Sequence, residues 1–93
     1  MIVMGEWNMY HKTVDVVVLN KAEGGIIPLF IVWDDGRKFK ITQSFSVGQR
    51  VSLSGGCGNL YYIIIKNKQK KLYHDVVHNN WFLEMQEDMG NQF

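Results

Sequence analysis

The chain has 93 residues, enough for one domain with one modest core. Its apolar share of 46% and charged share of 20% are those of ordinary globular proteins, which excludes a chain that is disordered throughout. The formal net charge of +1 excludes a protein whose whole surface attracts nucleic acid. The many valine, isoleucine and aromatic residues favour strands over helices.

The cysteine content and the length of the apolar runs indicate the cellular compartment in which the protein is expected. Cys57 is the single cysteine and cannot form an internal disulfide. The N-terminal stretch has neither the basic region nor the apolar segment of a signal peptide, and no apolar run reaches the ~20 residues that cross a bilayer. We therefore expect a cytoplasmic protein in a reducing setting, without membrane contact.

The first elements in chain order are a leader and a strand. Residues 1–9 show no clear pattern and are expected to form a loosely ordered leader. Residues 10–19 alternate like a half-buried strand, with Val14, Val16 and Val18 on one face. A turn at 20–25 follows.

Residues 26–41 predict a hairpin around the sequence Asp-Asp-Gly. A two-residue loop would pair Val32 with Phe39. A three-residue loop would pair Ile31 with Phe39 instead and would place Gly36 in the left-handed region. We favour the three-residue loop, because it puts the lysines that flank Phe39 together on the opposite face.

The middle of the chain predicts a bend and then a strand. Residues 43–49 have the composition of a bend. Residues 50–54 alternate, which predicts a strand with Val51 and Leu53 inward and Ser52 outward.

Residues 59–65 predict a strand that is apolar on both faces. One face carries Leu60, Tyr62 and Ile64, and the other carries Tyr61, Ile63 and Ile65. Such a strand needs cover on both sides, from a barrel interior on one side and from a helix, a loop or a partner chain on the other.

The last elements are a strand at 70–76 and a segment at 81–89 with two interpretations. Phe82, Met85 and Met89 have helical spacing, whereas residues 81–85 also alternate like a strand. We favour the strand, followed by an acidic tail at 87–93. The prediction for residues 10–86 is an all-β domain, a small barrel or a strongly curled antiparallel sheet of about six short strands.

Three short motifs follow one another in a fixed order along the chain. They are "PLFIVWDDGRKF", "GGCGNLY" and "WF" at Trp81 and Phe82. In this order they resemble a group of small bacterial proteins with P-L-x-I-x-W-x-D-G-R-x-F, then G-G-x-G-x-x-Y, then W-F. The resemblance covers residues 10–84 and implies a compact all-β domain whose final strand contains Trp81 and Phe82. It implies no particular activity.

The glycine-rich sequence "SGGCGN" at 54–59 does not predict nucleotide binding. A phosphate-binding loop needs a lysine and a serine or threonine before a helix, and this loop precedes a strand. Cys57 has no histidine beside it in the sequence that would activate a thiolate. The loop is therefore interpreted as a sharp turn into the strand at 59–65.

The histidines do not predict a metal site or an active site. His74 and His78 would lie about 13 Å apart along one strand, too far to share an ion, although a turn would bring them closer. No carboxylate pair or triad stands out. We expect no catalytic residue, no metal ion and no cofactor, and a small enzyme or a metal-binding domain is the third-ranked interpretation.

A local basic patch is the candidate binding site. It consists of Lys66, Lys68, Lys70 and Lys71, with Tyr61, Tyr62 and Tyr73 nearby. Small barrels bind single-stranded nucleic acid with lysines on phosphates and aromatic rings on bases. The alternative interpretation is a solvated hairpin that protects a sheet edge, with the tyrosines in the core.

Protein binding ranks above nucleic-acid binding at this stage. The two apolar faces of residues 59–65 are more than so small a barrel is expected to cover internally. We therefore predict a non-catalytic interaction module that binds a protein partner or a second copy of itself, such as a homodimer. Weak binding of single-stranded nucleic acid is the alternative.

Overall fold

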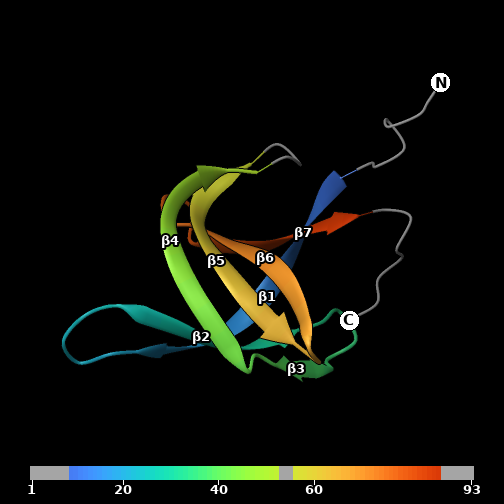
Figure 1. Ribbon diagram of the computed structural model, residues 1–93, viewed down its shortest axis with the longest axis horizontal. Coiled ribbons are helices and arrows are strands. Elements are labelled where there is room, and N and C mark those ends of the chain that lie inside the picture. The colour runs from blue at the N-terminus through green and yellow to red at the C-terminus, as the bar shows by residue number, and fades with distance from the viewer. Residues whose placement is uncertain (1–8, 53–55, 87–93) are drawn as a thin grey trace.

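The computed structural model describes residues 9–52 and 56–86, which form seven antiparallel strands (Figure 1). The strands are β1 (Met9–Asn20), β2 (Ile26–Val32), β3 (Lys38–Lys40), β4 (Gln43–Val51), β5 (Cys57–Ile65), β6 (Lys68–Asp75) and β7 (Asn80–Gln86). Over these ranges no helix has the length and apolar character that crossing a membrane requires.

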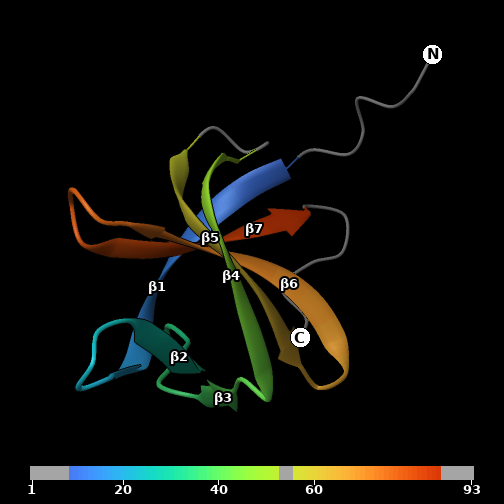
Figure 2. The same cartoon turned by 60° about the vertical axis from the view of Figure 1, so that its left-hand side comes forward.

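The strands form one sheet in the order β3-β2-β1-β7-β6-β5-β4 (Figures 1 and 2). The two outermost strands, β3 and β4, are consecutive in the chain, so the sheet must curl to bring its edges together. Ile41 N donates to Leu29 O of β2 at 2.9 Å, and Thr42 N donates to Ile64 O of β5 at 2.9 Å. The connection at 41–42 thus hydrogen-bonds to both sides of the curled sheet. The predicted fold class, an all-β domain with a strongly curled antiparallel sheet, is confirmed.

The β2–β3 hairpin has the three-residue loop that the sequence favours. Ile31 pairs with Phe39, and Trp33 N donates to Arg37 O at 2.8 Å. Gly36 lies in the left-handed region with φ of 89°, where a residue without Cβ is unstrained. The register places Ile31 and Phe39 in the core.

The prediction of a bend at 43–49 is wrong, because Gln43–Val51 is one strand, β4. Its register with β5 shifts between Ser46 and Gly48. Such a bulge bends a strand and shifts which side chains face inward. Val51 is accordingly 79% exposed and Ser52 is buried, the reverse of the predicted orientation. Leu53 lies outside the described residues.

The C-terminal segment is a strand as far as residue 86, as favoured over a helix. β7 pairs with both β1 and β6, and its central position explains why Trp81, Phe82 and Leu83 are all buried. At the other end of the domain, Met9 is already the first residue of β1. The rest of the leader, residues 1–8, and the tail at 87–93 lie outside the described residues.

Hydrophobic clusters lie on both faces of β5. The main core, on its inner face, contains Tyr61, Ile63 and Ile65 together with Leu72 and Leu83. On the outer face, a second cluster is formed by the buried residues Leu60, Tyr73 and Phe82, with Val47 and Tyr62 packed against it. Part of this outer cluster is covered by the end of the β4–β5 hairpin, since a Cβ atom built on Gly56 would lie 2.8 Å from Cζ of Phe82.

Gly58 allows β5 and β6 to approach closely at the start of β5. A Cβ atom built on Gly58 would lie 2.6 Å from the carbonyl oxygen of His74, which belongs to the backbone of β6 and cannot rotate away. This glycine of the "GGCG" stretch therefore serves a close approach of two backbones.

We expect Gly58→Ala to destabilise the domain by about 1–3 kcal/mol, because the added methyl group must push β5 and β6 apart. Urea denaturation measures the effect. Cys57→Ala is the matched control, since Cys57 is the exposed neighbour, and it is expected to change stability by less than about 0.5 kcal/mol. Equal stability of the two variants would contradict this account of Gly58.

Candidate nucleic-acid interface

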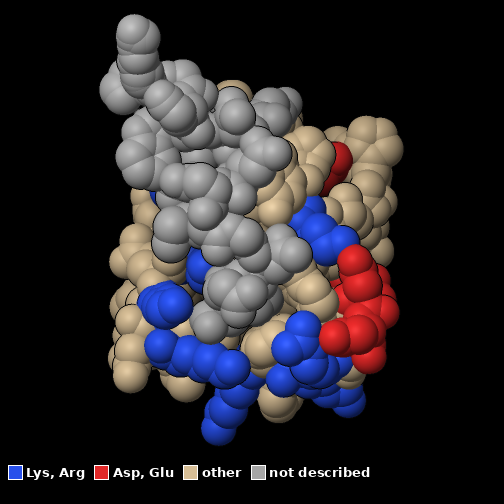
Figure 3. Space-filling view, turned by 90° about the vertical axis from the view of Figure 1, so that its right-hand side faces the viewer, with Lys and Arg blue, Asp and Glu red and all other residues tan. Residues whose placement is uncertain are grey.

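Lysine and arginine side chains gather at one end of the domain (Figure 3). Seven of the ten Lys and Arg residues belong to two hairpins that lie far apart in the sequence. They are Arg37, Lys38 and Lys40 of the β2–β3 hairpin and Lys66, Lys68, Lys70 and Lys71 of the β5–β6 hairpin. The curl of the sheet brings the tips of these hairpins together.

A hollow of about 470 Å³ lies between the two hairpins. We call it the basic groove, and its lining is Arg37, Lys38, Phe39, Lys40, Thr42, Ile65 and Lys66. Arg37 and Lys66 both lie over the ring of Phe39, at 5.4 Å and 5.2 Å from its centroid. The buried Phe39 ring therefore fixes the position of one cation from each hairpin.

The net charge of the groove is positive. Arg37 Nε donates to Asp35 Oδ2 at 2.7 Å, and hydrogen bonds from the Arg37 backbone and side chain hold the pKa of Asp35 below its ordinary value of 3.8. Lys38, Lys40 and Lys66 form no ion pair with a carboxylate of the described residues. An anion in the groove would thus meet three lysines that no described acid neutralises.

The free edge of β3 adds backbone donors. Among the described strands, β3 pairs only with β2. Arg37 and Ile41 hydrogen-bond across to β2, and alternation along an antiparallel pair turns the amides of Lys38 and Lys40 the other way. Amide N–H groups at such an edge are suited to an anionic oxygen.

Lys66 occupies a strained turn position. Lys66 and Asn67 have φ of 52° and 65° and connect the paired residues Ile65 and Lys68. Two-residue turns of this kind favour Asn-Gly, and a lysine in the left-handed region costs roughly 1 kcal/mol. The backbone conformation therefore does not explain why this residue is a lysine. We infer that the charge of its side chain does, because strain of this kind is common at functional sites.

The structure divides the four lysines that the sequence singles out. Lys66 lines the groove, and Lys68 is exposed opposite Ile65, which also lines it. Lys70 lies opposite Ile63 and is half-buried, so burial and then the charge of Lys68 lower its pKa. Lys71 lies on the outer face, where its Nζ is 3.7 Å from Glu84 Oε2.

The three tyrosines are also separated. Tyr61 is buried in the main core against Trp81, and burial raises the pKa of its hydroxyl. Tyr73 is buried in the second cluster, stacked on Phe82 at 4.9 Å. Only Tyr62 is half-exposed, on the outer face of β5. Tyr61 and Tyr73 therefore have structural positions, and Tyr62 alone of the three is accessible to a ligand.

Glu84 is a buried carboxylate of β7, inside the strand predicted at 81–85. Its Oε1 accepts from Ser52 Oγ at 2.6 Å and from Tyr73 OH at 3.4 Å, beside the ion pair with Lys71. Burial, and then the charge of Glu84, raise the pKa of Tyr73. The contact joins the end of the β4–β5 hairpin to β7 across the outer face. Its alternation with Leu83 and Met85 was the signal that Glu84 lies on a packed strand.

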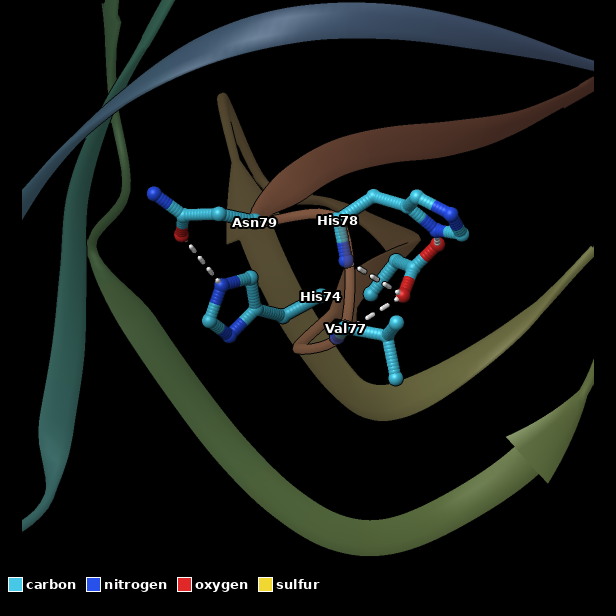
Figure 4. A network of polar contacts seen from close by, with 5 residues as sticks. His74, Val77, His78 and Asn79 are labelled. Atoms are coloured by element: carbon cyan, nitrogen blue, oxygen red, sulfur yellow. Dashed lines mark hydrogen bonds and ion pairs between the residues drawn. The ribbon is translucent and has the colours of Figure 1, made fainter.

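The β6–β7 turn has a network of its own, at the end of β5 and β6 away from the basic hairpin (Figure 4). Asp75 Oδ2 lies 2.8 Å from His78 Nδ1, and Asp75 Oδ1 accepts from the backbone N–H groups of Val77 and His78. These bonds, the His78 side chain first, lower the pKa of Asp75. His74 Nε2 lies 3.2 Å from Asn79 Oδ1.

The histidines of this turn are occupied by structural contacts. The His74 ring also stacks on Trp81 at 4.1 Å, and no cluster of three or more metal-ligating side chains exists among the described residues. Cys57 is exposed and belongs to β5. Asp75 therefore stabilises the turn between β6 and β7 by accepting hydrogen bonds from its backbone.

These features define a small all-β domain with a basic groove between two hairpin tips. Comparison of the chain with protein-family models, with curated proteins and with solved structures finds no match. The resemblance in motif order therefore stays a prediction. The proposed function rests on the geometry and charge of the site itself.

We expect Ser52→Ala to destabilise the domain by about 1–3 kcal/mol, because the buried Glu84 carboxylate loses the 2.6 Å hydrogen bond from the Ser52 hydroxyl. The free energy of unfolding in urea measures the change. Ser44→Ala, at a half-buried serine of β4, is the matched control and is expected to have a smaller effect. A Ser52→Ala variant as stable as the wild type would show that this hydrogen bond does not hold the hairpin on the sheet.

Proposed function

We propose that this domain is a non-catalytic binding module whose basic groove binds the phosphate backbone of single-stranded nucleic acid. The observation that carries the proposal is the meeting of Lys38, Lys40 and Lys66 around one hollow of about 470 Å³. Lysine side chains and edge amides are the groups that bind phosphate oxygens in nucleic-acid interfaces.

The size and charge of the groove favour a single strand over a duplex. Seven of the ten Lys and Arg residues lie on the two hairpins, in a domain whose net charge is only +1, so long-range attraction to a duplex is weak. A basic groove of this kind is the arrangement with which small barrels follow the backbone of a flexible single strand.

A cytoplasmic location is part of the same proposal. Cys57 is a free and exposed thiol, which suits a reducing compartment. Single-stranded RNA or DNA would be accessible to the groove there.

The double variant Lys38→Glu/Lys40→Glu is expected to bind a fluorescent single-stranded oligonucleotide at least about tenfold more weakly than the wild type at low salt. Its plot of log affinity against log salt concentration should also flatten, by about 0.7 for each phosphate that the variant no longer neutralises. Fluorescence anisotropy at several salt concentrations measures both quantities.

The matched control is Lys21→Glu/Arg50→Glu, which changes the net charge by the same amount at exposed positions outside the groove. This control should keep most of the affinity. Equal loss of affinity in the two variants would mean that net charge alone attracts the oligonucleotide. Absence of salt-dependent binding by the wild type would contradict the proposal.

Self-association is a second candidate, favoured by exposed valines at the end away from the basic hairpin. Val51 ends β4, and Val76 and Val77 lie in the β6–β7 turn with exposures of 61% and 87%. Exposed apolar side chains at neighbouring hairpin ends are typical of contact surfaces. Because Leu60 on the second face of β5 is buried and Tyr62 packs against the second cluster, these more exposed valines are the better support for a homodimer or a protein partner.

If a homodimer forms through these valines, light scattering at micromolar concentration should give twice the monomer mass, and Val77→Lys should restore the monomer by placing charges in the interface. Val17→Lys, on the exposed face of β1, is the control and should stay dimeric. A wild-type protein that remains monomeric at all concentrations would exclude this candidate.

A further inference from the structure

The outer face of β4, β5 and β6 carries two rows of side chains that the basic groove does not use. The strand register places Gln43, Ile64 and Gln69 side by side in one row, and Phe45, Tyr62 and Lys71 in the next. Residues directly opposite each other in an antiparallel sheet share a face, and residues two apart along a strand also share it. The two rows therefore form one surface, which we call the outer platform.

Phe45 is the exposed aromatic residue of this platform. Phe45 is 60% exposed, whereas most large apolar residues of the described sheet are buried or half-buried. Its cross-strand neighbour Tyr62 packs against the second cluster, which holds the ring in place while leaving part of it exposed. Within the described residues, Phe45 belongs to neither hydrophobic cluster. Exposed aromatic rings on adjacent strands are suited to stacking with nucleobases.

The platform begins where the basic groove ends. Thr42 lines the groove, and its N and Oγ1 both donate to Ile64 O, in the first row. Phe45 follows three residues later, about 10 Å along β4. A strand whose phosphates lie in the groove would thus pass over the platform within a short distance.

The polar groups around Phe45 fit a nucleobase as well. Gln43 and Gln69 are exposed and present amide groups that can donate to and accept from base edges. Lys71 continues the positive charge from the groove on to the platform, although Glu84 shares it. Aromatic, amide and cationic groups together match a single strand better than an apolar protein surface.

We propose that the outer platform is the base-binding half of the site, in which Phe45 and Tyr62 stack with unpaired bases of the strand that the groove holds. This inference rests on the proposed function and adds to it the requirement for bases. Because every base has a ring face, the site would accept many sequences and would reject duplex, whose bases are already stacked.

The test compares two labelled oligonucleotides of equal length and charge, a single-stranded oligothymidylate and its abasic analogue, by fluorescence anisotropy. The wild type is expected to bind the oligothymidylate about five- to a hundredfold more tightly than the abasic strand. Phe45→Ala should lose most of this difference while its affinity for the abasic strand and its salt dependence stay unchanged. Because Phe45 is exposed, the variant should fold, which circular dichroism checks.

Two control variants sharpen the test. Phe45→Trp keeps a ring and should keep the preference for the oligothymidylate. Val17→Ala removes an exposed apolar side chain from β1, outside the platform and outside the exposed valines at the end of β4 and in the β6–β7 turn, and should bind as the wild type does.

The outcomes separate this inference from the proposed function. Equal, salt-dependent binding of both strands by the wild type would overturn the inference and leave the groove proposal standing. No binding of either strand would overturn both. A Phe45→Ala variant that binds both strands normally but changes the mass measured by light scattering would assign the platform to a second copy of the chain instead.

Discussion

The structure depends on one constraint, the need to cover both faces of β5. Its residues alternate between the main core and a second cluster, so neither face can be left to water without exposing large apolar side chains. A flat sheet would cover one face only. The sheet curls instead. On its outer face Leu60, Tyr73 and Phe82 are cross-strand neighbours, and the end of the β4–β5 hairpin lies against Phe82, where a Cβ built on Gly56 would be 2.8 Å from the ring. Gly58 and the Ser52–Glu84 hydrogen bond belong to this arrangement, since both bring strands close together.

The same curl produces the candidate site. The chain passes directly from β3 to β4 at opposite edges of the sheet, and residues 41–42 hydrogen-bond to both sides. The tips of the β2–β3 and β5–β6 hairpins consequently meet, each with its own lysines, around Phe39. A domain with almost no net charge thus acquires a locally positive end. The proposed site follows from how the core is closed, and no catalytic constellation is needed to account for it.

Charge and exposed aromatic rings are distributed so that the two halves of the proposed site have different tasks. The groove offers lysines and edge amides, which recognise phosphate without regard to base. The outer platform offers Phe45 and the partly exposed Tyr62, which respond to the presence of bases. Exposed valines at the other end of β5 and β6 leave room for association with protein at a separate surface.

The sequence by itself determined the all-β class, the strand at 59–65 with its two apolar faces, and the β2–β3 register, because alternation and turn chemistry are local properties. It misplaced residues 43–52, since the bulge at Gly48 depends on how β4 bends over β5. It grouped Lys66, Lys68, Lys70 and Lys71 by proximity in the chain, but only the tertiary structure separated Lys71 and added Lys38 and Lys40. It did not show that Glu84 is buried. Which side chains face one another depends on how the sheet closes. That closure rests on contacts between strands distant in sequence, which the local sequence pattern does not reveal.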